Sequence, residues 1–431
     1  MATLNDIAWA SFFNKNEILA EIKWNGYAHV SADDLREKGG REPRLMAKLD
    51  TIAERPHIFQ EYDLNILPVQ NGQYVLFQDR ENKSYFPFKE LLDDVPVEDY
   101  ISQIDLPSFD TFPLNRAFSE SQAIDFAFVS SLLQHFCQCQ TLHLSVRGRL
   151  SSGEFDLKLP DFGNKIDVSN VQIEVDSGYE NDDQIVLLEA KIGRRSDFHI
   201  RQLVYPYRQW SARTRKRIRP VFLTYSNGQY VLTEFAIGET YGELEVVSNR
   251  AFTINDSDVA LINLAQSVQS VEEETEPDMI PFPQANDMDK VIDTIQLIDI
   301  GVNTKVALTE FFEFGERQSY YYSDAARYLG FVEKRGQTFF LTEIGRDFLT
   351  LPARTQRTKA VFRQMLKRPS LRAALILLGE RQFELAALSD KELADIIKVK
   401  SNSELSDATH IRRASTLRKW FKWLLKNSSL R

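Results

Sequence analysis

The hydrophobic and polar positions of this chain follow two periods, which predict two kinds of element. Helical spacing of apolar residues predicts helices at 4–26, 119–136 (with Ser119 as the cap) and 197–212. Alternation with a period of two predicts strands at 142–146, 154–159, 171–176 and 184–191. Alternating runs also flank Asn71-Gly72, which favours a hairpin with a primed turn, and Asn227-Gly228, which favours a second hairpin. Pro206 predicts a kink in the third helix or an early end.

The last third of the chain is mainly helical. Helices are predicted at 289–300, 304–314 and 317–334, and 336–351 has the pattern of a strand that runs into a helix. Three helices followed by a β-wing form the winged variant of the helix-turn-helix. Residues beyond 352 repeat this pattern less clearly.

The chain therefore divides into five predicted parts around an α/β (α+β) core, a mixed sheet flanked by helices. They are an N-terminal α+β module with possible DNA recognition (1–112), the core (113–255), an acidic linker (256–287), a winged helix-turn-helix (288–352) and a basic second helical or winged-helix module (353–431).

Composition restricts the class of protein. The longest apolar runs, such as 373–378, are too short to cross a bilayer, and the first residues lack the pattern of a secretory signal. The two cysteines, Cys137 and Cys139, lie in an amphipathic run and are expected to be reduced thiols. We therefore expect a cytoplasmic protein.

Charge is distributed unevenly along the chain. The net charge of −10 argues against a nucleic-acid partner, but residues 353–431 hold 18 Lys and Arg against 7 Asp and Glu, a local net of +11. The other 352 residues hold 34 against 55, a net of −21. This asymmetry predicts that DNA contact is concentrated in patches, although a solvated basic helix face has the same composition.

The residues with the clearest chemistry are Asp176, Glu189 and Lys191. In a strand Glu189 and Lys191 project from the same face, and the 13 residues after Asp176 allow two adjacent strands to bring the carboxylates together. Two carboxylates suit Mg²⁺, which activates a water, and a lysine orients that water. Glu174 faces the same way as Asp176 and is a possible extra metal ligand, and Glu180 is a weaker candidate.

A structural ion pair is the alternative for this set, because isolated E-x-K triplets usually lie on solvated strand edges. Here Glu189 and Lys191 lie within the apolar run IVLLEAKIG. Burial of two charges is costly unless they are paired or bind a metal, so the setting favours a functional site.

These residues resemble a known signature. Asp176 followed by Glu189-Ala190-Lys191 resembles that of the PD-(D/E)xK nuclease superfamily, and Gln202 with Tyr205 and Tyr207 resembles the glutamine-tyrosine helix of its RecB-type members. Longer strings resemble bacterial type II restriction endonucleases over most of the chain, namely REPRLMAKLD, EVDSGYE, LLEAK, DFHIRQLVYPYRQW, ERQSYYYSDAARYLGFVEK and RRASTLRKWFKWLL.

The resemblance implies a restriction-endonuclease-like core that cuts double-stranded DNA at a short specific site with Mg²⁺ and leaves 5′-phosphate ends. It implies that Asp176 and Glu189 bind the metal, that Lys191 is catalytic, and that Gln202 supports the site or touches the DNA backbone. One departure is that Val175, not proline, precedes Asp176, which leaves the choice between Glu174 and Asp176 open.

Glu120 and the basic segment around Arg147 each have two interpretations. Glu120 resembles the helix acid that some superfamily members use near the metal, but it is equally an exposed residue of a first helical turn. Arg147 and Arg149 could bind phosphate or lie in a solvated loop.

The DNA-reading residues are predicted from the C-terminal modules. Side chains at the start of a recognition helix usually meet base edges, and basic residues of a wing or helix face meet phosphates. The candidates are Arg317, Gln318, Ser319 and Tyr322 on the helix, Arg335 and Gln337 on the wing, and Arg412, Arg413, Arg418 and Lys419 in the last module.

The sequence thus predicts a type II restriction endonuclease, expected as a homodimer with a cognate DNA methyltransferase in the same system. The alternatives are a non-catalytic DNA-binding regulator, in which the acidic residues are structural, and a nuclease for modified or damaged DNA. The sequence contains no phosphate-binding loop of the helicase type, which disfavours an ATP-driven repair enzyme.

Overall fold

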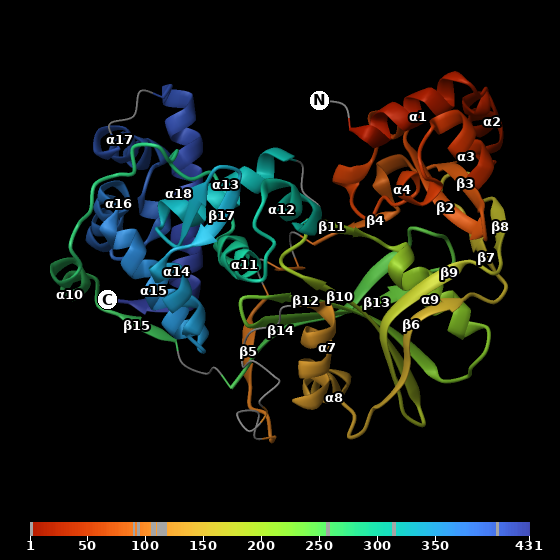
Figure 1. Ribbon diagram of the computed structural model, residues 1–431. Helices are drawn as coiled ribbons and strands as arrows, with labels where there is room; N and C mark the ends of the chain where they lie inside the picture. The colour runs from red at the N-terminus through yellow and green to blue at the C-terminus, as the bar shows by residue number, and fades with distance from the viewer. Residues whose placement is uncertain are drawn as a thin grey trace.

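A mixed seven-stranded sheet forms the centre of the protein in this computed structural model (Figure 1). Its order is β5-β14-β13-β12-β10-β9-β6, with parallel pairs at β10–β12 and β14–β5 and antiparallel pairs elsewhere. The strands are β5 (Val97–Tyr100), β6 (His143–Ser151), β9 (Gln172–Glu180), β10 (Gln184–Ile192), β12 (Arg217–Ser226), β13 (Gln229–Ile237) and β14 (Leu244–Ile254).

The structure describes residues 3–88, 91–92, 95–104, 109, 119–255, 259–312, 316–401 and 405–431, without the side chains of 316–319. The chain forms a mixed α/β architecture in which helices accompany this sheet. Among these residues, no helix is long and apolar enough to span a membrane.

Two apolar layers cover the sheet. On one face, α7 (Glu120–Val129) and α8 (Leu132–Cys137) share a buried cluster with alternate residues of β10, β12, β13 and β14. On the other face, α9 (Arg201–Ser211) shares a cluster with the hairpin of the N-terminal part. Alternate strand residues point to opposite faces, and both faces of the central strands are covered. The runs at 184–191 and 220–225 are therefore largely apolar and do not alternate with polar residues.

The N-terminal part has its own small sheet, in the order β1-β3-β2, and a separate apolar cluster around Trp9 and Phe59. It packs beside α9 in Figure 1. Its elements are α1 (Leu4–Asn14), α2 (Ile18–Asn25), β1 (Tyr27–Ser31), α3 (Ala32–Gly39), α4 (Pro43–Met46), α5 (His57–Glu61), β2 (Leu64–Gln70), β3 (Gln73–Gln78) and β4 (Tyr85–Pro87).

Two small ribbons connect these parts. Strand β4 pairs with β11 (Asp197–His199), and β7 (Phe155–Lys158) pairs with β8 (Lys165–Val168).

The C-terminal part is helical and has one continuous apolar cluster, from Ala260 to Leu424. Its elements are β15 (Ala260–Ile262), α10 (Leu264–Ser270), α11 (Met288–Asp299), α12 (Lys305–Phe312), α13 (Glu316–Tyr328), β16 (Val332–Arg335), β17 (Thr338–Leu341), α14 (Glu343–Thr350), α15 (Arg354–Lys367), α16 (Pro369–Glu380), α17 (Asp390–Lys400), α18 (Asp407–Asn427) and β18 (Ser428–Leu430). Strand β15 pairs in parallel with β18, so this part closes on itself.

The acidic stretch before α11 is bound to this helical part. Glu274 forms ion pairs with Lys367 and Arg368, each at 2.9 Å, and Glu276 accepts hydrogen bonds from the backbone and the hydroxyl group of Ser370. These contacts neutralise part of the positive charge counted in residues 353–431, so the exposed basic surface is smaller than the composition suggests.

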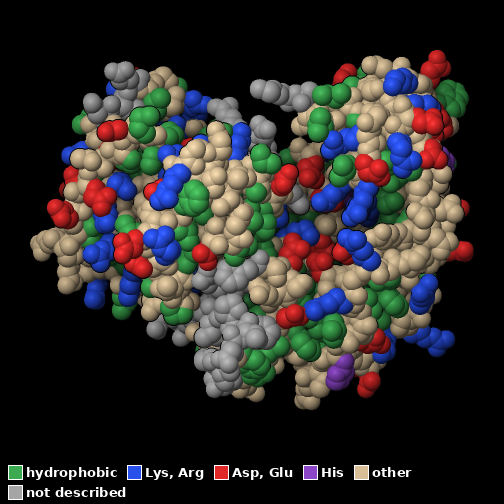
Figure 2. All heavy atoms as spheres, in the orientation of Figure 1, with side chains coloured by type: hydrophobic (Ala, Val, Ile, Leu, Met, Phe, Trp, Pro, Cys, Tyr) green, Lys and Arg blue, Asp and Glu red, His purple; other side chains and the backbone are tan. Residues whose placement is uncertain are grey.

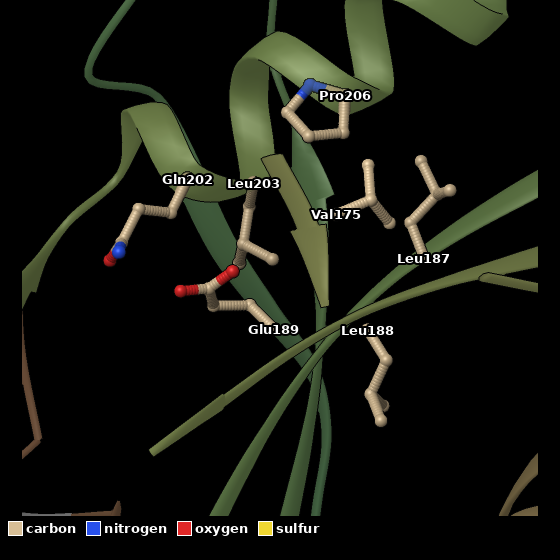
Figure 3. Close-up of a pocket in the computed structure, with 7 residues that line it drawn as sticks. All are labelled: Val175, Leu187, Leu188, Glu189, Gln202, Leu203 and Pro206. Carbon is tan, nitrogen blue, oxygen red and sulfur yellow. The ribbon is translucent and has the colours of Figure 1, made fainter. Parts of the chain in front are cut away.

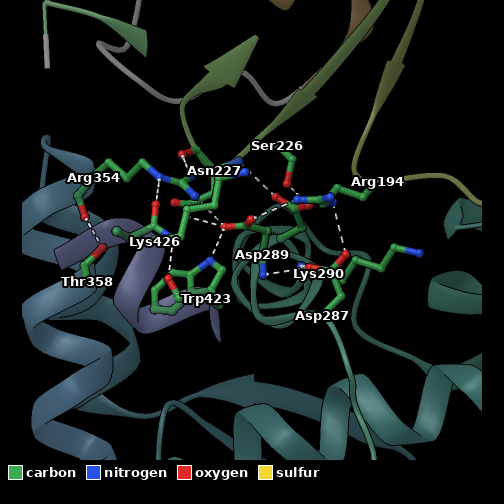
Figure 4. Close-up of polar contacts among 12 residues, drawn as sticks. Arg194, Ser226, Asn227, Asp287, Asp289, Lys290, Arg354, Thr358, Trp423 and Lys426 are labelled. Atoms are coloured by element: carbon green, nitrogen blue, oxygen red, sulfur yellow. Dashed lines mark hydrogen bonds and ion pairs between the residues drawn. The ribbon is translucent and has the colours of Figure 1, made fainter. Parts of the chain in front are cut away.

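A buried ionic network joins the helical part to the sheet (Figure 4). The carboxylate of Asp289, on α11 and 2% exposed, lies 3.0 Å from Arg354 Nη2 and 3.3 Å from Arg194 Nη1. It also accepts hydrogen bonds from Asn227 Nδ2 at 3.0 Å and Trp423 Nε1 at 2.9 Å. Burial alone would raise the pKa of Asp289, but the two arginines lower it to about 2.

A second carboxyl group of α11, that of Asp293, contacts the turn between β12 and β13, to which Asn227 belongs. Asp293 accepts hydrogen bonds from Ser226 Oγ at 2.6 Å and from the backbone of Asn227 at 3.2 Å. Burial raises its pKa to about 7. The hairpin turn of the sheet is therefore held by α11, α15 and α18 together.

The structure corrects two local predictions, the turn of the first hairpin and the unbroken helix at 119–136, and agrees with the Asn-Gly turn predicted for the second hairpin. Among Asn71 and Gly72 only Gly72 has a positive φ, so the first hairpin does not have a primed turn; its ladder is irregular between Pro68 and Gln70, where proline offers no N–H to pair. Asn227 and Gly228 both have positive φ. The helix at 119–136 is broken at Ser131, which has a φ of 65°.

The capping prediction for Ser119 is confirmed, since its side chain accepts from the backbone of Gln122. Helix α9 does not end at Pro206 but continues to Ser211. Pro206 removes one helical hydrogen bond and crowds the preceding turn, but the apolar face of α9 still packs on the sheet and the helix continues.

We expect Asp289→Ala to lower the free energy of unfolding by about 3–5 kcal/mol, because it removes the buried carboxylate that pairs with Arg354 and leaves Arg194 with Asp287 as its remaining carboxylate. Asp33→Ala, which removes an exposed ion pair on α3, is the matched control and should change it by less than about 1 kcal/mol. Urea unfolding measures both. Equal small shifts would show that the network does not hold the helical part on the sheet.

Candidate functional site

Strands β9 and β10 bring the predicted acids together. They pair antiparallel, with Ser177 opposite Leu188, so Asp176 lies beside the end of β10 that carries Glu189. Asp176 Oδ2 accepts a hydrogen bond from the backbone N–H of Ala190 at 2.8 Å. One carboxylate oxygen is thus fixed by the neighbouring strand.

Glu189 and Lys191 lie on one face of β10, as strand alternation predicts. Lys191 Nζ is 2.7 Å from Glu189 Oε1 and 3.7 Å from Glu120 Oε1, at the start of α7. It also donates to the carbonyl of Ala190 at 3.2 Å. The Glu189 and Lys191 side chains are only 7% and 12% exposed, so charged groups are concentrated within the apolar core.

Burial and the neighbouring charges determine how these groups ionise. Burial raises the pKa of Glu189, and the charges of Asp176 and Glu120 add to this effect, so that the pKa is about 8 despite the opposing effect of Lys191. Burial alone would lower the pKa of Lys191, but the carboxylates of Glu189, Glu120 and Asp176 raise it above its ordinary value. Lys191 is therefore a cation at neutral pH, which does not act as a base.

Gln202 lies on the first turn of α9, next to the acids. With Glu189, Val175 and Leu203 it lines a small hollow, with room for about one water molecule (Figure 3). Its Oε1 is buried and has no hydrogen-bond partner among the described atoms. Pro206 also lines the hollow and, as a proline, donates no hydrogen bond to the carbonyl of Gln202.

The remaining acids predicted from the sequence make other contacts. Glu174 is 58% exposed at its side chain and lies 3.3 Å from Arg149 of β6. Glu180 pairs with Lys216 at 2.5 Å. Arg147 is on β6, not in a loop, and pairs with Asp125. The structure therefore groups Asp176, Glu189, Lys191 and Glu120, and places Glu174 in a separate surface pair.

The donor set suits one small hard cation. Among the described residues, no group of three or more His, Cys, Asp or Glu side chains could hold a metal by itself. Mg²⁺, however, commonly uses one or two carboxylates and takes its other ligands from water and substrate phosphate. Asp176 and Glu189 offer these two carboxylates, and the carbonyl of Ala190 is a third oxygen beside them.

The surface is hollowed between the N-terminal and C-terminal parts. Figure 2 shows acidic side chains in this hollow, with Lys and Arg side chains gathered beside them over the region of α4 and β4. The sequence did not predict Lys48 and Arg201, two cations that share the carboxylate of Asp50. Arg201 directly precedes Gln202, and its position at the start of the same helix is the signal that could have identified it.

The segment predicted as a recognition helix forms helix α13. The four residues predicted on it to contact DNA do not all lie on its surface. Arg317, Gln318 and Ser319 belong to this helix, and their side chains lie outside the described part. Tyr322 packs against the apolar cluster, with its ring 6.4 Å from that of Phe312. The tyrosine side chain therefore faces the interior, away from the surface on which DNA contact was predicted.

On the wing, Arg335 is exposed, pairs with Glu333 at 2.5 Å and lies over the ring of Phe340. Gln337 lies in the turn between β16 and β17 and is exposed. Both side chains are accessible to a partner.

The basic face predicted for the last helix is narrower than expected. Arg412 and Lys419, seven residues apart on α18, are exposed on the same side. Arg413 is 6% exposed and lies against Gln284, because neighbouring helical residues point about 100° apart. Arg418 pairs with Asp390 at 2.8 Å and donates to the carbonyl of Leu388. Arg413 and Arg418 thus serve packing within the helical part.

The glutamine-tyrosine helix also contains an internal contact. Tyr205 is 2% exposed, and its hydroxyl group donates to the carbonyl of Pro68 at 2.8 Å. This tyrosine attaches α9 to the N-terminal part.

We expect Glu189→Gln to gain stability relative to the wild type as the pH rises from about 5 to about 8 in EDTA. The Glu189 carboxyl group has a pKa of about 8 in the folded protein and 4.5 as a free side chain, so the folded state holds the proton more tightly. Wild-type stability therefore falls over this range, whereas glutamine loses no proton. Thermal unfolding at several pH values measures the difference. A difference that does not vary with pH would contradict the buried, proton-holding carboxyl group.

Three family profiles match the chain, one after another. Residues 6–76 match a domain of unknown function (DUF6996), residues 80–253 match a second (DUF6997), and residues 290–429 match a third (DUF7226). No curated protein and no solved structure matches the chain. The chain is thus similar to three domains that carry no functional description.

Proposed function

We propose that this protein is a divalent-cation-dependent DNA endonuclease of the site-specific, type II restriction kind. The observation that carries the proposal is the placement of Glu189 and Lys191, buried at the end of β10, beside Asp176 on β9. Buried charged groups are costly to a fold unless they bind something or are fully paired. The resemblance of this set to the PD-(D/E)xK signature supports the same interpretation.

In this proposal, Asp176, Glu189 and the carbonyl of Ala190 hold Mg²⁺. When bound, Mg²⁺ supplies a positive charge that acidifies water and offsets the charge on phosphoryl oxygens. Lys191 is a permanent cation and provides a proton donor and a positive charge near the reacting phosphate. Its present contact with Glu189 is the contact that a metal ion would take over.

Two further residues complete the proposed site. The amide oxygen of Gln202, which is buried without a partner, accepts a hydrogen bond from water at the hollow. Glu120 stays close to Lys191 and keeps its ammonium group oriented. A duplex cut requires two such sites, so we infer that the protein acts as a homodimer.

We also infer that α11, α12, α13, β16 and β17 form a winged helix that reads DNA. The order of three helices and a hairpin supports this inference, as does the isolated bridge between Thr304 and Thr338, which adds a third short strand. Arg335, Arg412 and Lys419 are exposed cations that suit phosphate contacts.

A non-catalytic DNA-binding protein is the second candidate. The short contact between Lys191 and Glu189 favours it, because this pair neutralises its own charge without a metal. A nuclease for modified or damaged DNA would share the site described above and differ in its DNA-reading surface.

We expect the wild type to cut unmodified plasmid or phage DNA into discrete fragments when Mg²⁺ is present. Lys191→Ala should cut at least about 100-fold more slowly, because the loss of one group that stabilises charge in a transition state lowers the rate by about this factor. Lys165→Ala, which breaks an exposed ion pair with Asp156 on β7, is the matched control. Gel analysis over time measures the rates.

The outcomes of this assay separate the candidates. Binding of DNA without cleavage by the wild type would favour the regulator, and cleavage of methylated DNA alone would favour the nuclease for modified DNA. A fully active Lys191→Ala variant would contradict the role given to this lysine.

We expect Mg²⁺ or Ca²⁺ to raise the melting temperature of the wild type but not that of the double variant Asp176→Asn, Glu189→Gln. An ion at 100 times its Kd stabilises the folded state by about 2.7 kcal/mol. Asp156→Asn, on the exposed strand β7, is the control for lost negative charge. An equal shift in all three proteins would place the bound ion elsewhere.

A further inference from the structure

The segment after α4 is fixed against the start of α9. Tyr85 Oη donates to the carbonyl of Leu49 at 3.1 Å, and the N–H of His199 donates to the carbonyl of Asp50 at 2.9 Å. The N–H of Ile52 donates to Asp197 Oδ1 at 2.8 Å. Two of these hydrogen bonds hold a loop of the N-terminal part against β11, which directly precedes the helix that carries Gln202, and the third holds the loop to β4, the strand that pairs with β11.

Two cations share one carboxylate at this junction. Lys48 Nζ lies 3.4 Å from Asp50 Oδ2, and Arg201 Nη2 lies 3.9 Å from Asp50 Oδ1. The lysine and arginine side chains are 59% and 24% exposed, whereas the carboxylate is 12% exposed. The carboxylate of Asp50 is thus more buried than the two cations, and Glu54 lies in the same loop, where its carboxylate accepts the backbone N–H of Asp50 at 2.7 Å.

This pair of cations lies at the start of α9, the helix that carries Gln202. Arg201 is the first residue of α9 and directly precedes Gln202, which lines the same hollow as Glu189. The N-terminus of α9 has no side-chain cap, since Ile200 occupies that position. Negative charge is stabilised at such a helix start, and here two side-chain cations add to the effect.

We propose that Lys48 and Arg201 bind a backbone phosphate of duplex DNA that flanks the scissile phosphate. The proposal rests on the proposed nuclease function and gives the N-terminal part a role in it. Lys and Arg form charge-assisted hydrogen bonds with phosphate oxygens. Both cations contact one carboxylate, so a single phosphate group can meet both of them, and a duplex held at the proposed nuclease site supplies such phosphates along its backbone.

Because Lys48 and Arg201 share the carboxylate of Asp50, one set of substitutions should weaken DNA binding and another should strengthen it. Removal of Lys48 and Arg201 should weaken DNA binding, whereas Asp50→Asn should strengthen it, because both cations lose their intramolecular partner. A gain in affinity cannot arise from a misfolded variant. Lys165→Ala, which removes an exposed lysine paired with Asp156, controls for lost positive charge elsewhere on the surface.

The experiment measures the affinity of full-length protein for a labelled duplex that contains its cleavage site, by fluorescence anisotropy in EDTA, over a range of salt concentrations. Each lost phosphate contact lowers the slope of log K against log salt by about 1. We expect slopes lower by about 1 for Lys48→Ala and by about 2 for the double variant Lys48→Ala, Arg201→Ala. The slope of Lys165→Ala should equal that of the wild type.

The outcomes distinguish this inference from the proposed function. Lower slopes for the two variants together with tighter binding by Asp50→Asn support the phosphate site. A wild type that binds and cuts DNA while Lys48→Ala, Arg201→Ala keeps its slope overturns the phosphate site alone. A wild type that neither binds nor cuts DNA overturns both.

Discussion

Strand β10 is the element on which the rest of this structure depends. Its antiparallel pairing with β9 brings Asp176 to the backbone of Ala190, and its parallel pairing with β12 joins it to the central strand of the sheet. Immediately after the strand, Arg194 enters the network around Asp289. One strand thus sets the spacing of the acids and also connects the sheet to the helical C-terminal part.

The charges of this region are stabilised in two different ways. Asp289 has two arginines and two hydrogen-bond donors, and its pKa is lowered, which is the behaviour of a satisfied structural carboxylate. Glu189 has one lysine and a raised pKa, which is the behaviour of a carboxyl group short of positive charge. A raised pKa alone does not separate the two roles, because burial also raises the pKa of Asp293, whose carboxyl group accepts hydrogen bonds from Ser226 and Asn227. Glu189 is interpreted as part of a binding site because it also lines the hollow beside Gln202, with the carboxylates of Asp176 and Glu120 close enough to raise its pKa. Functional sites are commonly built from such incompletely satisfied groups.

The sequence predicted what depends on local periodicity. The strands that carry Asp176 and Glu189, the cap at Ser119 and most helices follow from alternation, helical spacing and capping residues. Contacts between distant residues left no such local signal. The burial of Arg413, the pairing of Arg418 with Asp390 and the attachment of the acidic segment through Glu274 all depend on tertiary packing. For the same reason, the positive charge of the last module overstated its exposed basic surface, and the cations beside Gln202 were missed.

The central claim is that Asp176 and Glu189 form a divalent-cation site beside Lys191. The most direct measurement is the anomalous diffraction of Mn²⁺ in crystals of the protein, because Mn²⁺ accepts the same oxygen ligands as Mg²⁺ and can be located by its own scattering. The account predicts an anomalous peak between the two carboxylates and the carbonyl of Ala190, with Lys191 Nζ moved away from Glu189. Saturation with Mn²⁺ that leaves no peak there and keeps the contact between Lys191 and Glu189 would contradict it.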